Sequence, residues 1–538
     1  MKLICPFVER DCVEDRCAGW INGTCFVIPL SSNTSRVIPS ITETKLAPDK
    51  AHLVTSSAIH PSPHITKRPI HPDISLGLDF GTAYCKVTLR FKDGAPEPLK
   101  VGDQRSGEAL RQYCFPSVIY ISDVTGRLYF GADAEIKLQE ERAIDRGCRL
   151  VRSFKRALLT GHSEFVEHGR WLPPDQLAAF LIAALLQRVD VELEKKYGLY
   201  CYSKNYTVPV QFLDGEARPS KRVRRAIVIA EQLVEHLRQE PAPQLTNLQK
   251  LYEALDNEFD NLPAEMVSQN LSEPNAAAWE VAKDPLYAYG HYCLIDSGAG
   301  TTDITFFEKR SGPVPIAIGA SIGLDLGGSD IDNCVEELIA EKLRTGYSYD
   351  LNSQAALFDR LSLEQAKREI KEKVLTQEVG VFSTEHNQSV SISLQELLDS
   401  PGVMDFAKQV DATFTAGLKQ ARNKFGAENF NKDLQRVYMI GGTAKLLMAN
   451  GLTTNLRSKP IWTNLKNTRG QIVAVESLEA SQELKLSYPG IEQIYPLVAI
   501  SIGASWKKLP KEVLPEGIIE PPKPVPKYEQ NYTRKEDV

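Results

Sequence analysis

The sequence predicts an α/β protein with two or more domains, and three observations support this prediction. From residue 74 to about residue 508, apolar runs of strand length alternate with longer segments of helical periodicity. Within that region, two glycine-bearing acidic loops each lie between two apolar runs, which is the pattern of a strand, a tight turn and a strand. A length of 538 residues is also more than one domain usually needs.

Composition limits the classes of protein and partner. Apolar residues make up 42% of the chain and charged residues 25%, which is typical of a soluble protein with large cores. The net charge of −6 disfavours nucleic acid and anionic membranes as partners, although nucleic acid stays open. No apolar run is long enough to span a bilayer, and Glu9, Arg10 and Asp11 interrupt the start of the chain too early for a signal-peptide core. We therefore expect a cytoplasmic protein with reduced thiols.

Four of the ten cysteines, Cys5, Cys12, Cys17 and Cys25, fall within the first 25 residues. A segment this short can bury almost no core, so four thiolates predict a metal-binding module over residues 1–30 that holds Zn²⁺ or an iron–sulfur cluster. The spacing lacks the paired C-x-x-C knuckles of common zinc ribbons. A redox-active or simply flexible cysteine-rich tail is therefore the alternative.

Other segments read as linkers and helices. Residues 31–73 are rich in Ser, Thr and Pro and predict a flexible linker, and the Pro-rich, charged residues 509–538 predict a disordered tail. Residues 173–197 and 218–239 have the apolar spacing of helices. The first turns of the second helix carry five basic residues. These residues form either a solvated face or a docking patch for an acidic partner or nucleic acid. Residues 240–262 predict an inserted polar excursion.

The two loops, residues 77–84 and 296–303, have the composition of a phosphate site. Glycines let backbone N–H groups approach an anion closely, and threonine hydroxyls add donors. Asp79 and Asp296 would repel a bare phosphate, so they predict a divalent cation, Mg²⁺, held largely through water. The alternative is two ordinary hairpin turns with Asp and Gly at turn positions.

An ordered series of motifs surrounds these loops between residues 74 and about 505. They read Phe-Pro-Ser-Val at 115–118, Gly-Ala-Asp-Ala at 131–134, Arg-Ser-Phe-Lys-Arg at 152–156, Thr-Val-Pro-Val-Gln-Phe at 207–212, Ser-Glu-Pro-Asn-Ala-Ala-Ala at 272–278, Leu-Gly-Gly-Ser-Asp-Ile-Asp-Asn at 326–333, Glu-Gln-Ala-Lys-Arg at 364–368 and Ile-Gly-Gly-Thr-Ala-Lys at 440–445. Together with the loops, this series resembles the ATPase domain of the seventy-kilodalton heat-shock chaperones of the DnaK type, within the actin-like ATPase superfamily.

The resemblance implies an α/β, actin-like ATPase fold of two ribonuclease-H-like lobes around a nucleotide cleft, plus the small N-terminal Cys-rich module. Lobe I would cover residues 74–272, with the insertion near 240–262. Lobe II and the final helix would cover residues 273–508. The ligands implied are ATP, ADP and Mg²⁺.

The resemblance also implies roles for individual residues. Lys155 is the catalytic lysine, Glu273 positions the attacking water, Asp79 and Asp296 orient the hydrated Mg²⁺, and Thr301 holds phosphate. The remaining implied nucleotide contacts are Gly81, Thr82, Ala83, Tyr84, Lys86, Gly298, Ala299, Gly300, Thr302, Gly328, Glu364, Lys367, Arg368, Gly441, Gly442 and Thr443.

Two positions depart from the family pattern, and a third is ambiguous. Tyr495 stands where the family has Asp before Pro496, which puts an adenosine contact in doubt. Ala299 replaces a loop glycine and is tolerable only where φ is not positive. Lys86 occupies the position of a phosphate-contacting lysine in actin-like members, and an outward-facing strand lysine is the alternative.

These features predict a slow, chaperone-like ATPase switch that acts through a protein partner or client. Because the chain ends about 30 residues after the ATPase match, we expect no peptide-binding domain. The alternatives are an actin-like filament-forming ATPase, a small-molecule kinase, and a nucleotide-sensing scaffold with little hydrolysis. The oligomeric state stays open.

Overall fold

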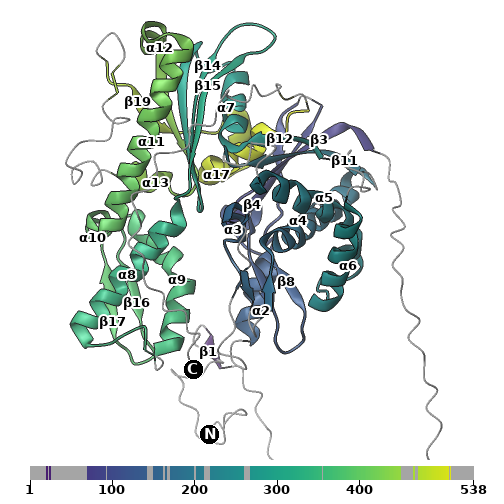
Figure 1. Cartoon of the computed structure of the whole chain (residues 1–538), viewed down its shortest axis with the longest axis vertical. Helices are drawn as coiled ribbons and strands as arrows, with labels where there is room; N and C mark the ends of the chain where they lie inside the picture. The colour runs from purple at the N-terminus through teal and green to yellow at the C-terminus, as the bar shows by residue number, and fades with distance from the viewer. Residues whose placement is uncertain are drawn as a thin grey trace, which may run out of the picture. The chain divides into compact units, whose positions relative to one another are not determined.

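Two large β-sheets organise the part of the chain that the computed structural model describes (Figure 1). The described residues are 20–21, 24–25 and 70–509, except 93, 142–149, 161–163, 167–169, 199–200, 211–217, 260–266, 354–355, 450–464, 467–470 and 508. Residues 1–62 and 63–538 form two separate units, and each is described by itself.

In the first unit the structure describes one short hairpin. Strand β1 (Trp20–Ile21) pairs antiparallel with β2 (Thr24–Cys25), so the backbone of Cys25 lies in this hairpin. Cys5, Cys12 and Cys17 lie outside the described residues, and so do most of the linker and tail segments. Among the residues that the structure describes, no group of three or more His, Cys, Asp or Glu side chains could hold a metal ion. The cysteine metal site therefore stays a prediction.

The first large sheet has the strand order β12-β11-β3-β4-β5, with β6 also paired to β4. Its central strand β3 begins at Ile70, inside the segment predicted as linker, and ends at the first glycine loop. Strands β4, β5 and β6 run antiparallel to their neighbours, and β11 and β12 run parallel to β3. The strands are β3 (Ile70–Phe80), β4 (Tyr84–Phe91), β5 (Pro96–Pro98), β6 (Phe115–Pro116), β11 (Cys201–Val208) and β12 (Val267–Ser272).

Helices α4 (Pro174–Tyr197) and α5 (Arg218–Gln239) confirm the two helices that the apolar spacing predicts. Pro174 starts α4 and Gly198 ends it, as expected for these residue types. On α5, Arg222 donates to the carbonyl oxygen of Leu158 at 2.9 Å and Arg225 pairs with Asp256, so part of the basic face is used within the fold.

Residues 240–262 differ from the predicted polar excursion. They contain helix α6 (Leu245–Asn257), which packs against α5. Four apolar side chains at helical spacing, Leu245, Leu248, Tyr252 and Leu255, are buried in the same core as α4 and α5. The sequence of this segment predicts a polar excursion because the outer face of the helix is charged. Only a narrow stripe of apolar side chains packs into the core.

The second large sheet has the order β15-β14-β13-β18-β19. Strands β13 and β14 flank the second glycine loop and pair antiparallel, with Asp296 opposite Asp303. Helix α11 (Pro401–Phe425) packs against β14 and β15, and helix α7 (Glu273–Lys283) packs against β13, β14 and β15. The strands are β13 (Gly290–Ser297), β14 (Thr302–Lys309), β15 (Ile316–Leu324), β18 (Leu434–Ile440) and β19 (Ala474–Ser477).

Helices α7 and α17 (Ile491–Ala504) connect the two sheets. Helix α17 packs against β3 and β4 of the first sheet and against α7, which lies on the second sheet. The helices cross closely at Gly503, where an added Cβ would collide with the carbonyl oxygen of Ala276. A buried cluster of apolar residues from both helices fills this crossing. The mixed α/β structure confirms the predicted fold class and fits an actin-like ATPase fold.

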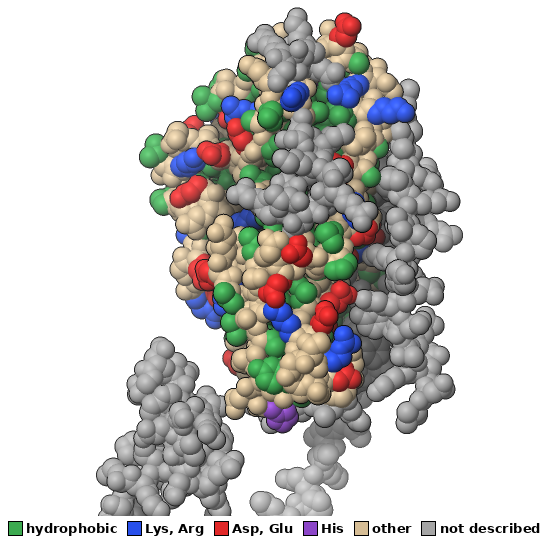
Figure 2. All heavy atoms as spheres, turned by 90° about the vertical axis from the view of Figure 1, so that its left-hand side faces the viewer, with side chains coloured by type: hydrophobic (Ala, Val, Ile, Leu, Met, Phe, Trp, Pro, Cys, Tyr) green, Lys and Arg blue, Asp and Glu red, His purple; other side chains and the backbone are tan. Residues whose placement is uncertain are grey.

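Smaller elements complete the unit. They are α1 (Ala109–Tyr113), β7 (Ile119–Ile121), β8 (Leu128–Phe130), α2 (Gly131–Glu141), α3 (Phe154–Thr160), β9 (Glu164–Val166), β10 (Arg170–Leu172), α8 (Gly328–Tyr347), α9 (Leu357–Leu375), β16 (Gly380–Ser383), β17 (Ser389–Ile392), α10 (Leu394–Asp399), α12 (Ala427–Asp433), α13 (Ala444–Leu447) and α16 (Gln482–Ser487). Figure 2 shows acidic, basic and apolar side chains mixed over one face of the molecule.

None of the helices described is both long and apolar enough to cross a membrane.

Candidate functional site

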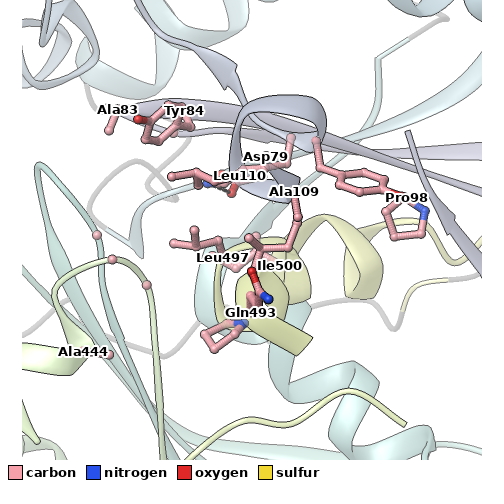
Figure 3. Close-up of a pocket in the computed structure, with 18 of the residues that line it drawn as sticks. Asp79, Ala83, Tyr84, Pro98, Ala109, Leu110, Ala444, Gln493, Leu497 and Ile500 are labelled. Atoms are coloured by element: carbon pink, nitrogen blue, oxygen red, sulfur yellow. Dashed lines mark hydrogen bonds and ion pairs between the residues drawn. The ribbon is translucent and has the colours of Figure 1, made fainter. Parts of the chain in front are cut away.

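A cavity of about 1750 Å³ lies between elements of the two sheets. The first loop, after β3, and the second loop, after β13, both line it, so Asp79 and Asp296 face the same space. Figure 3 shows Asp79 and Tyr84 beside this space, together with Gln493 and Leu497 of helix α17. The structure therefore brings the two loops together, although they are more than 200 residues apart in the sequence.

The two loops are in contact with each other. A Cβ added to Gly300 would lie 2.6 Å from the hydroxyl oxygen of Thr82, so only glycine fits at position 300 without displacing the Thr82 side chain. Ala299, the residue that replaces a loop glycine, does not have a positive φ. The condition for tolerating a methyl group there is met, and the loop can keep its shape.

The second loop is held by its neighbours. Thr443, in the loop after β18, donates its backbone N–H to the Ser297 carbonyl at 2.9 Å and its hydroxyl to the Gly298 carbonyl at 3.0 Å. Gly328, the first residue of α8, donates its backbone N–H to the same Gly298 carbonyl at 2.8 Å. Thr443 and Gly328 thus fix the backbone of the second loop, so the other backbone N–H groups of this loop can move little.

Lys86 points into the cavity, which excludes the alternative of an outward-facing strand lysine. Its ammonium nitrogen lies 2.6 Å from Oδ2 of Asp79, and both side chains are buried. Burial disfavours the charged lysine, but the carboxylate outweighs burial and raises the pKa of Lys86. The base of the first loop therefore carries an ion pair rather than a lone carboxylate.

Lys155 and Glu273 form a second buried ion pair in the cavity. Glu273 is the first residue of α7, where Ser272 caps the helix by accepting from the backbone N–H of Asn275 at 3.3 Å. Lys155 comes from the start of α3 on the opposite side. Burial raises the pKa of Glu273 although Lys155 acts in the opposite direction.

Asp296 and Asp303 place two further carboxylates beside these pairs. Burial, followed by the charge of Glu273, raises the pKa of Asp296 well above its usual value and that of Asp303 to about 8. Oδ1 of Asp296 is buried and has no hydrogen-bond partner in the described part of the chain. A divalent cation with its water shell fits here, because it binds oxygen ligands and would satisfy this orphaned acceptor.

Asp303 does not line the cavity but lies buried beside the lining residue Thr301, and it was not predicted. It accepts from the backbone N–H of Val210 at 3.2 Å and from the hydroxyl of Thr301 at 3.3 Å, and it is fully buried. Its position directly opposite Asp296 in the β13–β14 hairpin was the available signal, since paired residues of a hairpin share a face of the sheet.

The cavity lining also carries aromatic and basic groups. The guanidinium of Arg368, on α9, lies 5.5 Å from the ring centre of Tyr84, within the range of a cation–π contact. Lys445, Met448 and Gln377 also line the cavity and were not predicted as site residues. No sequence motif marked Met448 or Gln377, because neither belongs to a recognisable loop.

Most of the implied site residues line the cavity. They are Asp79, Gly81, Thr82, Ala83, Tyr84, Lys86, Lys155, Glu273, Asp296, Gly298, Ala299, Gly300, Thr301, Arg368, Gly441, Gly442 and Thr443.

Four implied contacts, Thr302, Gly328, Glu364 and Lys367, are not among the lining residues. The hydroxyl of Thr302 donates to the Leu326 carbonyl at 2.9 Å, and Gly328 supports the second loop. Lys367 pairs with Glu364 at 2.6 Å and with Glu336 of α8 at 2.8 Å. These residues support the lining rather than form it.

Tyr495, which departs from the family pattern, does not line the cavity. Its side chain is buried in the apolar cluster around α7 and α17. The next residue, Pro496, does line the cavity and accepts from the backbone N–H of Gly441 at 3.1 Å. Tyr495 therefore contributes to the core and does not place a new group in the cavity.

Comparison with known proteins adds an independent finding. Residues 273–469 match the family model described as Hsp70 protein. Chaperone protein DnaK of Methanothermobacter thermautotrophicus is 23% identical over 390 residues, which cover 72% of this chain and 56% of that protein. Chaperone protein DnaK of Nitrosopumilus maritimus is 22% identical over 392 residues, covering 72% of this chain and 52% of that protein. The chain spans about half the length of these curated relatives.

Proposed function

Because this chain carries an ATPase domain of the Hsp70 family, within the actin-like ATPase superfamily, we propose that it binds ATP and ADP with Mg²⁺ in the cavity between its two sheets. We further propose that it hydrolyses ATP to ADP and phosphate. One observation supports this proposal most strongly: the two glycine loops meet at Thr82 and Gly300 and line the same cavity as three buried carboxylates and two lysines.

The charges at the base of the cavity suit a metal–phosphate ligand. Three carboxylates line the cavity, those of Asp79, Glu273 and Asp296, and the buried Asp303 adds a fourth outside the lining. Lys86 and Lys155 bring only two ammonium groups. A buried excess of negative charge is unfavourable unless protons or cations offset it. Asp79 and Asp296 would hold hydrated Mg²⁺, which supplies positive charge next to the phosphate oxygens.

The chain's own groups would then do the positioning that phosphoryl transfer needs. Backbone N–H groups of both loops bind phosphate oxygens, because glycine and alanine allow close approach. Lys155 leaves its ion pair with Glu273 and neutralises charge at the γ-phosphate. Glu273, released from Lys155, accepts a hydrogen bond from the attacking water and orients it.

The same geometry supports a conformational output. Each loop belongs to a different sheet, so a ligand bound by both loops holds the two halves together. Loss of the γ-phosphate removes some of these contacts and favours opening. We propose that this chaperone-like switch turns over slowly by itself and acts through a protein partner or client.

The substitution Lys155→Ala tests the proposed hydrolysis. The variant should lose ATP turnover by on the order of a hundredfold or more, because a charge that stabilises the transition state is removed. ADP affinity, measured by calorimetry, should change little. Lys342→Ala is the matched control, since Lys342 pairs with Glu396 on α10 and does not line the cavity. Unchanged turnover in Lys155→Ala would exclude Lys155 from the mechanism.

A further inference from the structure

Helix α3 carries two adjacent basic residues that point to different places. Lys155 lines the cavity, whereas Arg156 reaches two aspartates on the side of the second sheet. The Nε atom of Arg156 lies 3.1 Å from Oδ1 of Asp325, and Nη2 lies 3.0 Å from the Asp325 carbonyl oxygen. Its Nη1 atom lies 3.2 Å from both carboxylate oxygens of Asp330. The guanidinium is therefore held by several charge-assisted bonds, which fix its orientation.

Asp330 links this arginine to the second phosphate loop. It lies in the first turn of α8, and its Oδ2 atom accepts from the backbone N–H of Gly327 at 2.9 Å. The next two amides, of Gly328 and Ser329, donate to the carbonyls of Gly298 and Ala299 at 2.8 and 2.7 Å. A continuous set of hydrogen bonds thus runs from Arg156 through the start of α8 to the second loop.

The entry to α3 is also strained. Ser153, two residues before Lys155, has a φ of 59°, a left-handed conformation that is unfavourable for residues other than glycine. The Ser153 carbonyl accepts from the backbone N–H of Arg156 at 3.0 Å. A conformation of this kind persists only where the surrounding structure imposes it. The bonds of Arg156 to Asp325 and Asp330 provide such a restraint one turn away.

We infer that Arg156 is a positioning residue for the proposed hydrolysis. It anchors α3 to the start of α8, which holds the second loop, and so fixes the position of Lys155 in the cavity. Arg156 does not line the cavity itself and acts only through its neighbour. The inference rests on the proposed function. Transition-state stabilisation depends steeply on placement, so a small shift of Lys155 lowers turnover more than it lowers nucleotide binding.

The test compares Arg156→Ala, Arg156→Lys and Asp330→Asn with the wild-type protein. The readouts are kcat, KM, the Kd of ADP and the thermal midpoint. In Arg156→Ala, kcat should fall by roughly ten- to a hundredfold while the Kd of ADP stays within about threefold. Arg156→Lys should recover only part of kcat, because an ammonium group lacks the fork that reaches both aspartates. Asp330→Asn keeps an oxygen that can accept from the backbone N–H of Gly327. It takes the place of Arg156→Ala as the test variant if the alanine variant does not fold.

A second substitution separates positioning from general stability. Adding Ser153→Gly to Arg156→Ala should restore part of kcat, because glycine adopts the left-handed conformation without the restraint. Arg225→Ala is the matched control: this arginine pairs with Asp256 on α6, and neither residue lines the cavity. Its kcat should match that of the wild type.

Three outcomes would overturn the inference. If kcat is unchanged in Arg156→Ala while Lys155→Ala loses turnover, the inference is wrong and the proposed function stands. A parallel loss of kcat and ADP affinity would make Arg156 a general structural residue. Absence of turnover in the wild-type protein would remove the proposed hydrolysis and the inference together.

Discussion

Individual side chains in the cavity have properties that follow from burial rather than from residue type alone. Asp79 and Asp296 occupy equivalent positions at the ends of β3 and β13, yet their surroundings differ. Asp79 is neutralised by Lys86 at 2.6 Å, whereas Asp296 keeps one oxygen without a partner in the described structure. We therefore expect Asp296 to depend more strongly on a bound cation than Asp79 does.

The two loops could be located from their glycine and aspartate content, whereas Lys155 was implied only by the resemblance of residues 152–156 to a segment of the chaperone ATPase domain. The partner of Lys86 could be predicted only after the hairpin register was known, since Asp79 and Lys86 are directly opposite across β3 and β4. The role of Arg156 could not be predicted, because its partners Asp325 and Asp330 lie about 170 residues further along the chain. Contacts of this range depend on how the elements pack.

The raised pKa of Asp303, about 8, predicts a pH-dependent stability for the nucleotide-free protein. The folded protein holds this proton more tightly than the unfolded chain, whose aspartates titrate near pH 4. The stabilisation is therefore complete below the unfolded pKa and is lost as pH rises through about 8. Thermal midpoints measured between pH 6 and 9 should fall with rising pH.

The variant Asp303→Asn provides the control for this effect, because an amide cannot titrate. Its midpoint should depend less on pH than that of the wild type over the same range. Equal slopes for the two proteins would show that Asp303 does not hold a proton in the folded state.

At the scale of elements, α4 and α5 followed from their apolar spacing. The two helices pack against each other, and their buried side chains belong to the same core as the strands of the first sheet. Helix α6 did not follow from apolar spacing, since its four buried residues occupy a narrow stripe within a polar segment. Helix α17 could be expected only as a final helix after Pro496, whereas it begins at Ile491 and contains that proline. Its packing between the two sheets could not be predicted, because that packing depends on close approaches at Gly77 and Gly503.

The crossing of α7 and α17 at Gly503 predicts a specific sensitivity. The substitution Gly503→Ala should lower the free energy of unfolding by roughly 1–3 kcal/mol, because the added methyl group collides with the backbone of α7. Denaturant unfolding measures this change. Gly346→Ala in α8 is the matched control: apart from α8's own backbone, no atom of the described residues lies within 4 Å of the added Cβ, and alanine favours the helix. A Gly503→Ala variant as stable as the control would contradict the packing described for the crossing.

At the scale of the whole molecule, two sheets with similar strand arrangements each present a glycine loop to one cavity. Helices α7 and α17 join the sheets and also contribute Glu273, Gln493 and Leu497 to the lining. A movement of one sheet relative to the other would therefore change the cavity and the helix crossing together. This connection is the physical basis for the proposed switch, since a nucleotide held by both loops would bias the arrangement of the whole unit.

The most direct test of the central claim is the affinity for ATP measured by calorimetry with Mg²⁺ and again with excess EDTA, for the wild-type protein and for Asp296→Asn. If both loops hold a magnesium-bound triphosphate, wild-type affinity should fall by at least about tenfold without Mg²⁺, and the Asp296→Asn variant should lose most of that metal dependence. Equal wild-type affinity with Mg²⁺ and with EDTA would contradict the account.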